Sequence, residues 1–187
     1  MNPSFRRALA KGFTLIELLI VVIIIAILAA IAIPQFSNTS SDAQEAALDA
    51  NLSTMRSAIE LYRLQHKNNY PGKVATKGGA DCATGSTGSG ETGDETSFKE
   101  ALSMYSNAAG QTCKVNTVGG AYIYGPYLRA VPDEPVTASK TVTIVTDAGN
   151  AVPTATPGGG WRFNTTTGQL VMNSKDKARD GRFYYEH

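Results

Sequence analysis

Few side chains in this sequence stand at spacings that suit acid–base, nucleophilic or metal chemistry. Two cysteines, Cys82 and Cys113, and two histidines are scattered along the chain and do not fit the ligand spacing of a zinc site. Cys113 and His66 could form a thiol–imidazole pair, but two cysteines in an oxidising compartment more often form a structural disulfide. No closely spaced carboxylates lie in an apolar context that suits general acid–base catalysis. The sequence therefore predicts a disulfide between Cys82 and Cys113, and no active site, metal or cofactor.

The most unusual chemical group is the carboxylate of Glu17, the only charged side chain in the 21-residue apolar run from Phe13 to Ile33. A helix of that length reaches about 31 Å, which matches the hydrocarbon core of a bilayer. A carboxylate inside such a span costs roughly 3 kcal/mol on insertion, so an ionisable residue there indicates a function.

The residues before this run predict its orientation. Residues 1–12 carry three basic side chains and no acidic one, so the positive-inside rule places them in the cytoplasm and the rest of the chain across the membrane. A cleaved secretory signal has a shorter apolar core, of about 7–15 residues, although Ala30-Ile31-Ala32 offers a small-residue cleavage site. A plain single-pass anchor fits the length but gives no reason for Glu17. A buried core helix would be amphipathic, whereas this run is apolar on every side.

The chain resembles type IV pilins and the pseudopilins of type II secretion in the segment from Lys11 to Val22, KGFTLIELLIVV, and the match continues without a gap to Phe36. The pattern is specific, because a short basic leader that ends in glycine, followed by phenylalanine and by a glutamate four residues later, is rare outside this family.

That resemblance implies how the N-terminus is processed. A membrane-bound prepilin peptidase would cleave between Gly12 and Phe13, and the new amine of Phe13 would be N-methylated. In this family the carboxylate that corresponds to Glu17 faces the N-terminal amine of a neighbouring subunit, which would relieve the cost of the buried charge. The expected organisation is a leader peptide over residues 1–12, a transmembrane and filament-core helix over 13–33, and an amphipathic helix followed by an α+β head over 34–187.

The helix is expected to continue beyond the apolar run. Pro34 removes one backbone hydrogen bond and predicts a kink or local melting, after which Ser41 and Asp42 offer capping groups. The helix should end near Asn68-Asn69. Uncharged residues recur at spacings of three and four and should lie on a sheet, whereas charged residues should occupy the opposite face. The first set is Gln44, Leu48, Leu52, Met55, Ile59 and Tyr62, and the second is Asp49, Arg56, Glu60 and Arg63.

The rest of the chain predicts a small antiparallel sheet and one short helix, so the fold class is α+β, as in the pilin fold that the resemblance implies. Residues 72–93 contain seven glycines and have too little apolar surface to order themselves. Helical spacing predicts a helix over 98–107. β-Branched and alternating residues predict strands at 141–146, 161–164 and 169–172, the last two forming a hairpin, with residues 183–185 of the charged tail docked on the sheet.

A second segment of resemblance, from Gly125 to Pro135, contains Gly-Pro-Tyr-Leu followed by two further prolines and is similar to the major pseudopilin of type II secretion. That family usually continues with Trp-Gly and a calcium loop of spaced aspartates. Here Val136 follows, and Asp147, Asp176 and Asp180 are too far apart to form one short loop around a hard cation. The calcium site is therefore not carried over.

The expected function is that of a structural subunit in a type IV pilus-like filament, most simply a major-pseudopilin-like component of a type II secretion system that helps to drive protein export. One alternative is a true type IV pilin in a surface fibre for adhesion, motility or DNA uptake. Another is a monomeric, membrane-tethered periplasmic binding module. The Gly-Pro-Tyr-Leu segment favours the pseudopilin, whereas the missing calcium loop and the glycine-rich insert favour the pilin. The tethered module is disfavoured because only assembly explains Glu17.

The partners implied by the resemblance are the prepilin peptidase, copies of the same chain, minor pilins or pseudopilins, an inner-membrane assembly platform and, before assembly, membrane lipid. The expected location is the inner membrane, crossed once, with the N-terminus cytoplasmic and the head periplasmic until it enters a filament. Without its three basic leader residues the net charge of +1 becomes −2. That balance gives no basic footprint for nucleic acid.

Overall fold

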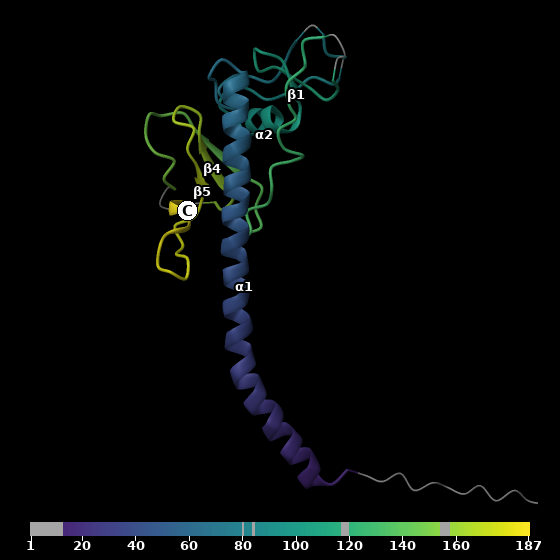
Figure 1. The fold of residues 1–187 in the computed structure, drawn as a ribbon, viewed down its shortest axis with the longest axis vertical. Coiled ribbons are helices and arrows are strands. Elements are labelled where there is room, and N and C mark those ends of the chain that lie inside the picture. The colour runs from purple at the N-terminus through teal and green to yellow at the C-terminus, as the bar shows by residue number, and fades with distance from the viewer. Residues whose placement is uncertain (1–12, 80, 84, 117–119, 154–157) are drawn as a thin grey trace, which may run out of the picture. The chain divides into compact units, whose positions relative to one another are not determined.

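The computed structural model describes residues 13–79, 81–83, 85–116, 120–153 and 158–187, apart from the side chains of residues 34 and 36–38. Its contacts divide the chain into two compact units, residues 1–41 and residues 42–187, which are described separately. The predicted leader lies outside the described residues. In chain order the elements are α1 (Leu15–Gln65), α2 (Glu95–Ser103), β1 (Tyr105–Ser106), β2 (Thr112–Cys113), β3 (Val142–Val145), β4 (Trp161–Asn164), β5 (Leu170–Met172) and the short 3-10 helix η1 (Tyr184–Glu186) (Figure 1). The predicted α+β class is confirmed.

Helix α1 continues through Pro34 without interruption, so the predicted local melting and the restart capped by Ser41 and Asp42 are wrong. A proline removes one backbone hydrogen bond, and the turns on either side keep theirs, so the helix can continue. The predicted kink at Pro34 stays a prediction. Within the first unit, the segment Leu15–Ile33 has a mean hydropathy of 3.3 and none of it is buried. Its length and composition suit a membrane span.

The second unit is built on the later part of α1, which lies beside the sheet and α2 (Figure 1). The predicted apolar stripe is confirmed: its five apolar members are at most 1% exposed, and Gln44 is half-buried. Burying each such side chain contributes roughly 1.5–3 kcal/mol to folding. They share one core cluster with α2 and the sheet, and the cluster includes Leu48, Leu52, Met55, Ile59, Tyr62, Phe98, Leu102, Trp161, Phe163, Leu170 and Met172.

Helix α1 ends at Gln65, close to the predicted end. Lys67 and Asn68 adopt left-handed backbone conformations, with φ of 54° and 61°. The backbone N–H of Asn68 then donates to the carbonyl oxygen of Arg63 at 3.0 Å, which closes the last turn as in a Schellman motif.

His66, which follows the last residue of α1, is buried and only 1% exposed. Its ring stacks on Tyr62 with 3.8 Å between the ring centroids. Its Nδ1 lies 2.8 Å from the carbonyl oxygen of Tyr62, and its Nε2 lies 2.9 Å from Oγ of Ser106. Because burial disfavours the charged form, the pKa of His66 is lowered.

The short helix α2 starts and stops earlier than the predicted helix over 98–107. It starts at Glu95 because the carboxylate of Asp94 accepts a hydrogen bond from the backbone N–H of Ser97 at 2.6 Å, which caps the first turn. It stops at Ser103 because Tyr105 and Ser106 form β1 and pair antiparallel with β2. Residues 105 and 106, which were predicted as helix, therefore belong to a two-stranded sheet.

The larger sheet has the order β3-β4-β5. Strands β4 and β5 form the predicted antiparallel hairpin, with Phe163 opposite Leu170. Strands β3 and β4 are parallel, with Val142 opposite Trp161, so the prediction of an antiparallel sheet is wrong for this pair and the sheet is mixed. The connection over residues 146–160 is long enough to bring the chain back to the same end of the sheet, as a parallel pair requires. Tyr184 of η1 is 8% exposed and belongs to the core cluster, so the tail docks as predicted.

The glycine-rich segment over 72–93 is held by polar contacts that the sequence pattern did not reveal. The carboxylate of Glu100 in α2 accepts hydrogen bonds from the backbone N–H groups of Ser89 at 2.9 Å and Gly90 at 3.0 Å, and another from the hydroxyl of Thr76. A disulfide joins Cys82 to Cys113 in β2. Hydrogen bonds and a covalent link thus replace the apolar contacts that this segment lacks.

Replacing both cysteines by serine should lower the stability of the head by about 3–4 kcal/mol in the chain-entropy model, because the bridge closes a loop of 31 residues. Urea unfolding of the oxidised wild type and the double variant would measure the difference. Thiol labelling of unreduced wild type should find no free cysteine. Two reactive thiols would refute the disulfide.

His66 should make the head less stable in mild acid. Its pKa is lowered by burial in the folded state, so below its ordinary value of 6.5 the unfolded chain binds the proton more readily. The free energy of unfolding should therefore fall as pH drops below about 6.5. Urea unfolding at pH 7.5 and pH 5.0 should show a smaller loss for His66→Gln than for wild type. An equal loss in both proteins would rule out this role.

Candidate functional site

The first turn of α1 holds Glu17 in a reciprocal set of hydrogen bonds with Thr14. The backbone N–H and the hydroxyl of Thr14 donate to Oε2 of Glu17 at 2.9 and 2.8 Å, and the backbone N–H of Glu17 lies 3.3 Å from Oγ1 of Thr14. This is a capping box that satisfies donors at the start of the helix. Sequence reasoning missed Thr14, although its place three residues before a glutamate and ahead of an apolar run is the signal for such a box.

The carboxylate of Glu17 keeps capacity for a further donor. Both bonds from Thr14 go to Oε2, and Oε1 accepts no hydrogen bond from the described residues. An ionised carboxylate has about four acceptor positions on its two oxygens. Glu17 also makes no ion pair within the described part of the chain. It can therefore accept a cationic donor from outside this chain while it still caps its own helix.

Phe13 stands beside this turn with 86% of its surface exposed. Gly12, the other half of the predicted cleavage site, lies outside the described residues. The cleavage, the N-methylation of Phe13 and the pairing of Glu17 with a neighbouring amine remain predictions.

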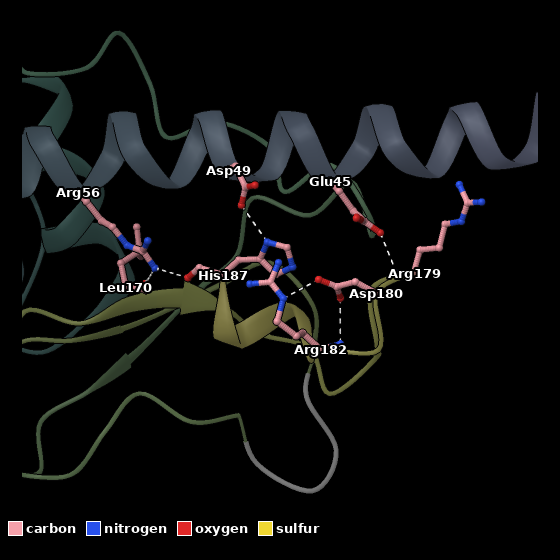
Figure 2. Close-up of polar contacts among 8 residues, drawn as sticks. All are labelled: Glu45, Asp49, Arg56, Leu170, Arg179, Asp180, Arg182 and His187. Carbon is pink, nitrogen blue, oxygen red and sulfur yellow. Dashed lines mark hydrogen bonds and ion pairs between the residues drawn. The ribbon is translucent and has the colours of Figure 1, made fainter.

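A second polar cluster joins the head part of α1 to the tail of the chain (Figure 2). Nη2 of Arg56 donates to the carbonyl oxygens of Leu170 at 2.9 Å and His187 at 2.7 Å. Nδ1 of His187 lies 2.9 Å from Oδ1 of Asp49. Asp49 and Arg56 were expected on the face opposite the sheet, which is wrong, because they flank the core and reach the tail.

The same flank of α1 carries two further acidic residues that contact the tail, Asp42 and Glu45, of which Glu45 is drawn in Figure 2. The backbone N–H of Arg179 donates to Glu45 at 2.9 Å, and its guanidinium lies 3.2 Å from Oδ1 of Asp42. Each exposed ion pair contributes little to stability on its own. No sequence signal marks these pairs, since Arg179 and Asp42 are 137 residues apart in the chain.

The other candidate groups from the sequence are not arranged for catalysis. Cys113 is bonded to Cys82, and the imidazole of His66 contacts Tyr62 and Ser106, so the proposed thiol–imidazole pair is not formed. Within the described ranges, no three or more His, Cys, Asp and Glu side chains come together in a way that could hold a metal ion.

Comparison with known proteins places the N-terminal turn in a recognised motif. Residues 7–33 match the prokaryotic N-terminal methylation motif, and this span contains Gly12, Phe13 and Glu17. The rest of the chain lies outside that match.

Curated relatives extend the similarity beyond the motif. The chain is 43% identical over 109 residues to a type IV major fimbrial protein, FimA, of Dichelobacter nodosus, covering 58% of this chain and 64% of that protein. It is 50% identical over 58 residues to the type IV narrow pilus major component PilA5 of Thermus thermophilus, covering 31% and 50%. It is 38% identical over 78 residues to fimbrial protein Q of Moraxella bovis, covering 42% and 50%.

The chain thus spans less than two thirds of the length of each of these relatives. No solved structure matches it significantly. The chain therefore shares with type IV fimbrial and pilus subunits the N-terminal methylation motif and sequence similarity that extends beyond it, and its structure has a long apolar helix followed by a small α+β head.

Proposed function

We propose that this protein is a structural subunit of a type IV pilus, in which many copies assemble through their N-terminal helices. The observation that carries the proposal is Glu17, a carboxylate whose Oε1 accepts no hydrogen bond from the described residues and which stands at the start of an apolar segment of which none is buried. A membrane anchor alone gains nothing from a charge there and loses roughly 3 kcal/mol on insertion. Assembly would explain the charge, because a cationic group of a neighbouring copy could pair with Glu17.

Before assembly, the segment Leu15–Ile33 would cross the inner membrane, with the leader in the cytoplasm and the head in the periplasm. The prepilin peptidase would cut after Gly12 and free the amine of Phe13. When helices pack side by side, that methylated amine would meet Oε1 of Glu17 on a neighbouring copy. Each charge would then offset the cost of burying the other. The chain would act as a filament subunit and not as an enzyme.

The choice between a surface pilus and a secretion pseudopilus rests on different observations. The relatives named as major fimbrial or pilus components favour a surface fibre. The Gly-Pro-Tyr-Leu segment favours a major-pseudopilin-like role in type II secretion, and this is the second candidate. Deleting the gene and examining whole cells by electron microscopy and the culture medium by proteomics would separate them. Loss of surface fibres supports the pilus, whereas loss of exported proteins supports the pseudopilus.

The mature protein should begin at N-methylated Phe13. Mass spectrometry of the N-terminal peptide from purified membranes measures this directly, and a start at Met1 or after Ala32 would contradict the prediction. Gly12→Ala should be processed best among substitutions at this position, because the peptidase must accept a small residue. Gly12→Leu should accumulate as uncleaved precursor.

Glu17→Ala should abolish or sharply reduce filaments while leaving processing, membrane insertion and the disulfide intact. Removing one partner of a buried ion pair leaves the other uncompensated, at a cost of about 3–5 kcal/mol. Leu18→Ala is a matched control in the same turn, since it removes apolar atoms but no charge. Immunoblots of sheared filaments and of membranes, with electron microscopy, would measure the effect. Filaments of normal number and length from Glu17→Ala would favour the plain anchor.

A further inference from the structure

A small pocket in the head is bordered by the residues that follow α1, by the turn between β1 and β2, and by the segment that leads to Tyr124. Its volume is about 410 Å³, within the range of roughly 300–1,000 Å³ that is usual for small-molecule sites. Most of its lining is apolar or aromatic and comes from Ala108, Ala109, Ala121, Ile123 and Tyr124. Ile123 is 62% exposed, so much of this apolar surface is open to a ligand.

Hydrogen bonds within the head hold the walls of this pocket in place. Oδ1 of Asn107 accepts from the backbone N–H groups of Ala109 at 3.0 Å and Gln111 at 3.1 Å, which orders the turn. Tyr124 is joined to Ser106 of β1 by two backbone hydrogen bonds, of 2.9 and 3.1 Å. A ligand that enters walls already ordered in this way does not have to offset the entropy of ordering them.

The charge of the pocket comes from Lys67. Among the described residues that line the pocket, Lys67 is the only charged one, and none is acidic. Its ammonium makes no hydrogen bond or ion pair within the described part of the chain, whereas other lysines of the head pair with a carboxylate. Those paired lysines are Lys77, Lys99 and Lys140. The pocket therefore presents one uncompensated positive charge beside apolar side chains.

The backbone of Lys67 gives a second, independent observation. Its φ of 54° lies in the left-handed region, at the position of the Schellman motif that glycine most often occupies. A side chain at that position carries a steric cost that glycine avoids. The closing of the helix end thus gives no reason for a lysine there, whereas a role for its ammonium does.

We propose that this pocket binds a small organic acid, with its carboxylate on Lys67 and a compact apolar body against Ala121 and Ile123. The ammonium offers up to three N–H donors, and no acidic side chain of the lining competes for them. The apolar lining favours an acid with a hydrocarbon body over a bare inorganic anion, because removing apolar surface from water stabilises the complex. A short aliphatic acid such as hexanoate meets both requirements. One chain builds the pocket, so this binding activity goes beyond the proposed filament function and does not depend on it.

Saturation-transfer NMR on the full-length, oxidised chain in detergent micelles tests the site with three matched probes. The signal from protein-free micelles is subtracted for each probe. Hexanoate should bind at millimolar concentration. Hexanol, which lacks the charge, and acetate, which lacks the apolar body, should each bind at least about tenfold more weakly. Added salt should weaken the binding of hexanoate, because it screens an exposed ion pair.

Two substitutions of Lys67 assign this binding to the pocket. Lys67→Gly removes the ammonium and also relieves the left-handed backbone, so the head should stay folded while hexanoate binding falls about tenfold. Lys67→Met keeps an unbranched side chain without the charge and should lose binding to the same extent. Lys73→Met is the matched control, since Lys73 is also exposed but does not line the pocket. It should bind hexanoate as wild type does, and urea unfolding would check the fold of all three variants.

Equal binding of hexanoate to wild type and to both Lys67 variants would overturn the site. Binding of hexanol as tight as that of hexanoate would refute the role of the charge, and binding of acetate as tight would refute the role of the apolar lining. An equal loss in Lys73→Met would show an effect of overall charge and would also count against the pocket. These measurements need no filaments, so their failure would leave the filament function standing, and Glu17→Ala tests that function separately.

Discussion

The structure depends on the burial of one stripe of α1 against the head. The same continuous helix is apolar over Leu15–Ile33, apart from Glu17, and amphipathic from about Asp42 onward. Two different surroundings therefore act on one secondary-structure element. The second half gains stability only where Leu48, Leu52, Met55 and Ile59 contact the sheet and α2, because a helix in water is held mainly by its tertiary contacts. The tail contacts one flank of this stripe, and the face opposite the core is exposed.

Much of this arrangement was predictable because its signals are local. The apolar stripe repeats every three or four residues, the β4–β5 hairpin follows from two β-rich runs with a short turn, and Glu17 is conspicuous as a lone charge. The missed contacts join residues far apart in the chain. The imidazole of His66 contacts Ser106, which lies 40 residues away, and the guanidinium of Arg56 donates to a carbonyl oxygen 131 residues away. Periodicity shows which face is buried, but it carries no information about polar partners.

The glycine-rich segment shows how a sequence with little apolar content can still be ordered. Composition alone indicated that residues 72–93 could not bury enough surface to offset the loss of backbone entropy. In the structure, the carboxylate of Glu100 accepts hydrogen bonds from Thr76, Ser89 and Gly90. A charged acceptor makes stronger hydrogen bonds than a neutral one. Hydrogen bonds to one acidic residue of a neighbouring helix thus hold the segment in place of apolar contacts, and no local sequence pattern predicts them.

The distribution of charge on α1 bears both on the folding of the head and on the proposed assembly. Exposed ion pairs such as Arg179 with Asp42 add little to the stability of the head. The position of these ion pairs is more informative than their energy. It shows that the charged groups of the helix lie on the flank that the tail approaches. A charge on the opposite face would have to lose its water whenever a partner packed there, and that cost would oppose association. Keeping the face at Ser53, Ser57 and Leu61 uncharged removes this cost while leaving the monomer's charged flank in water.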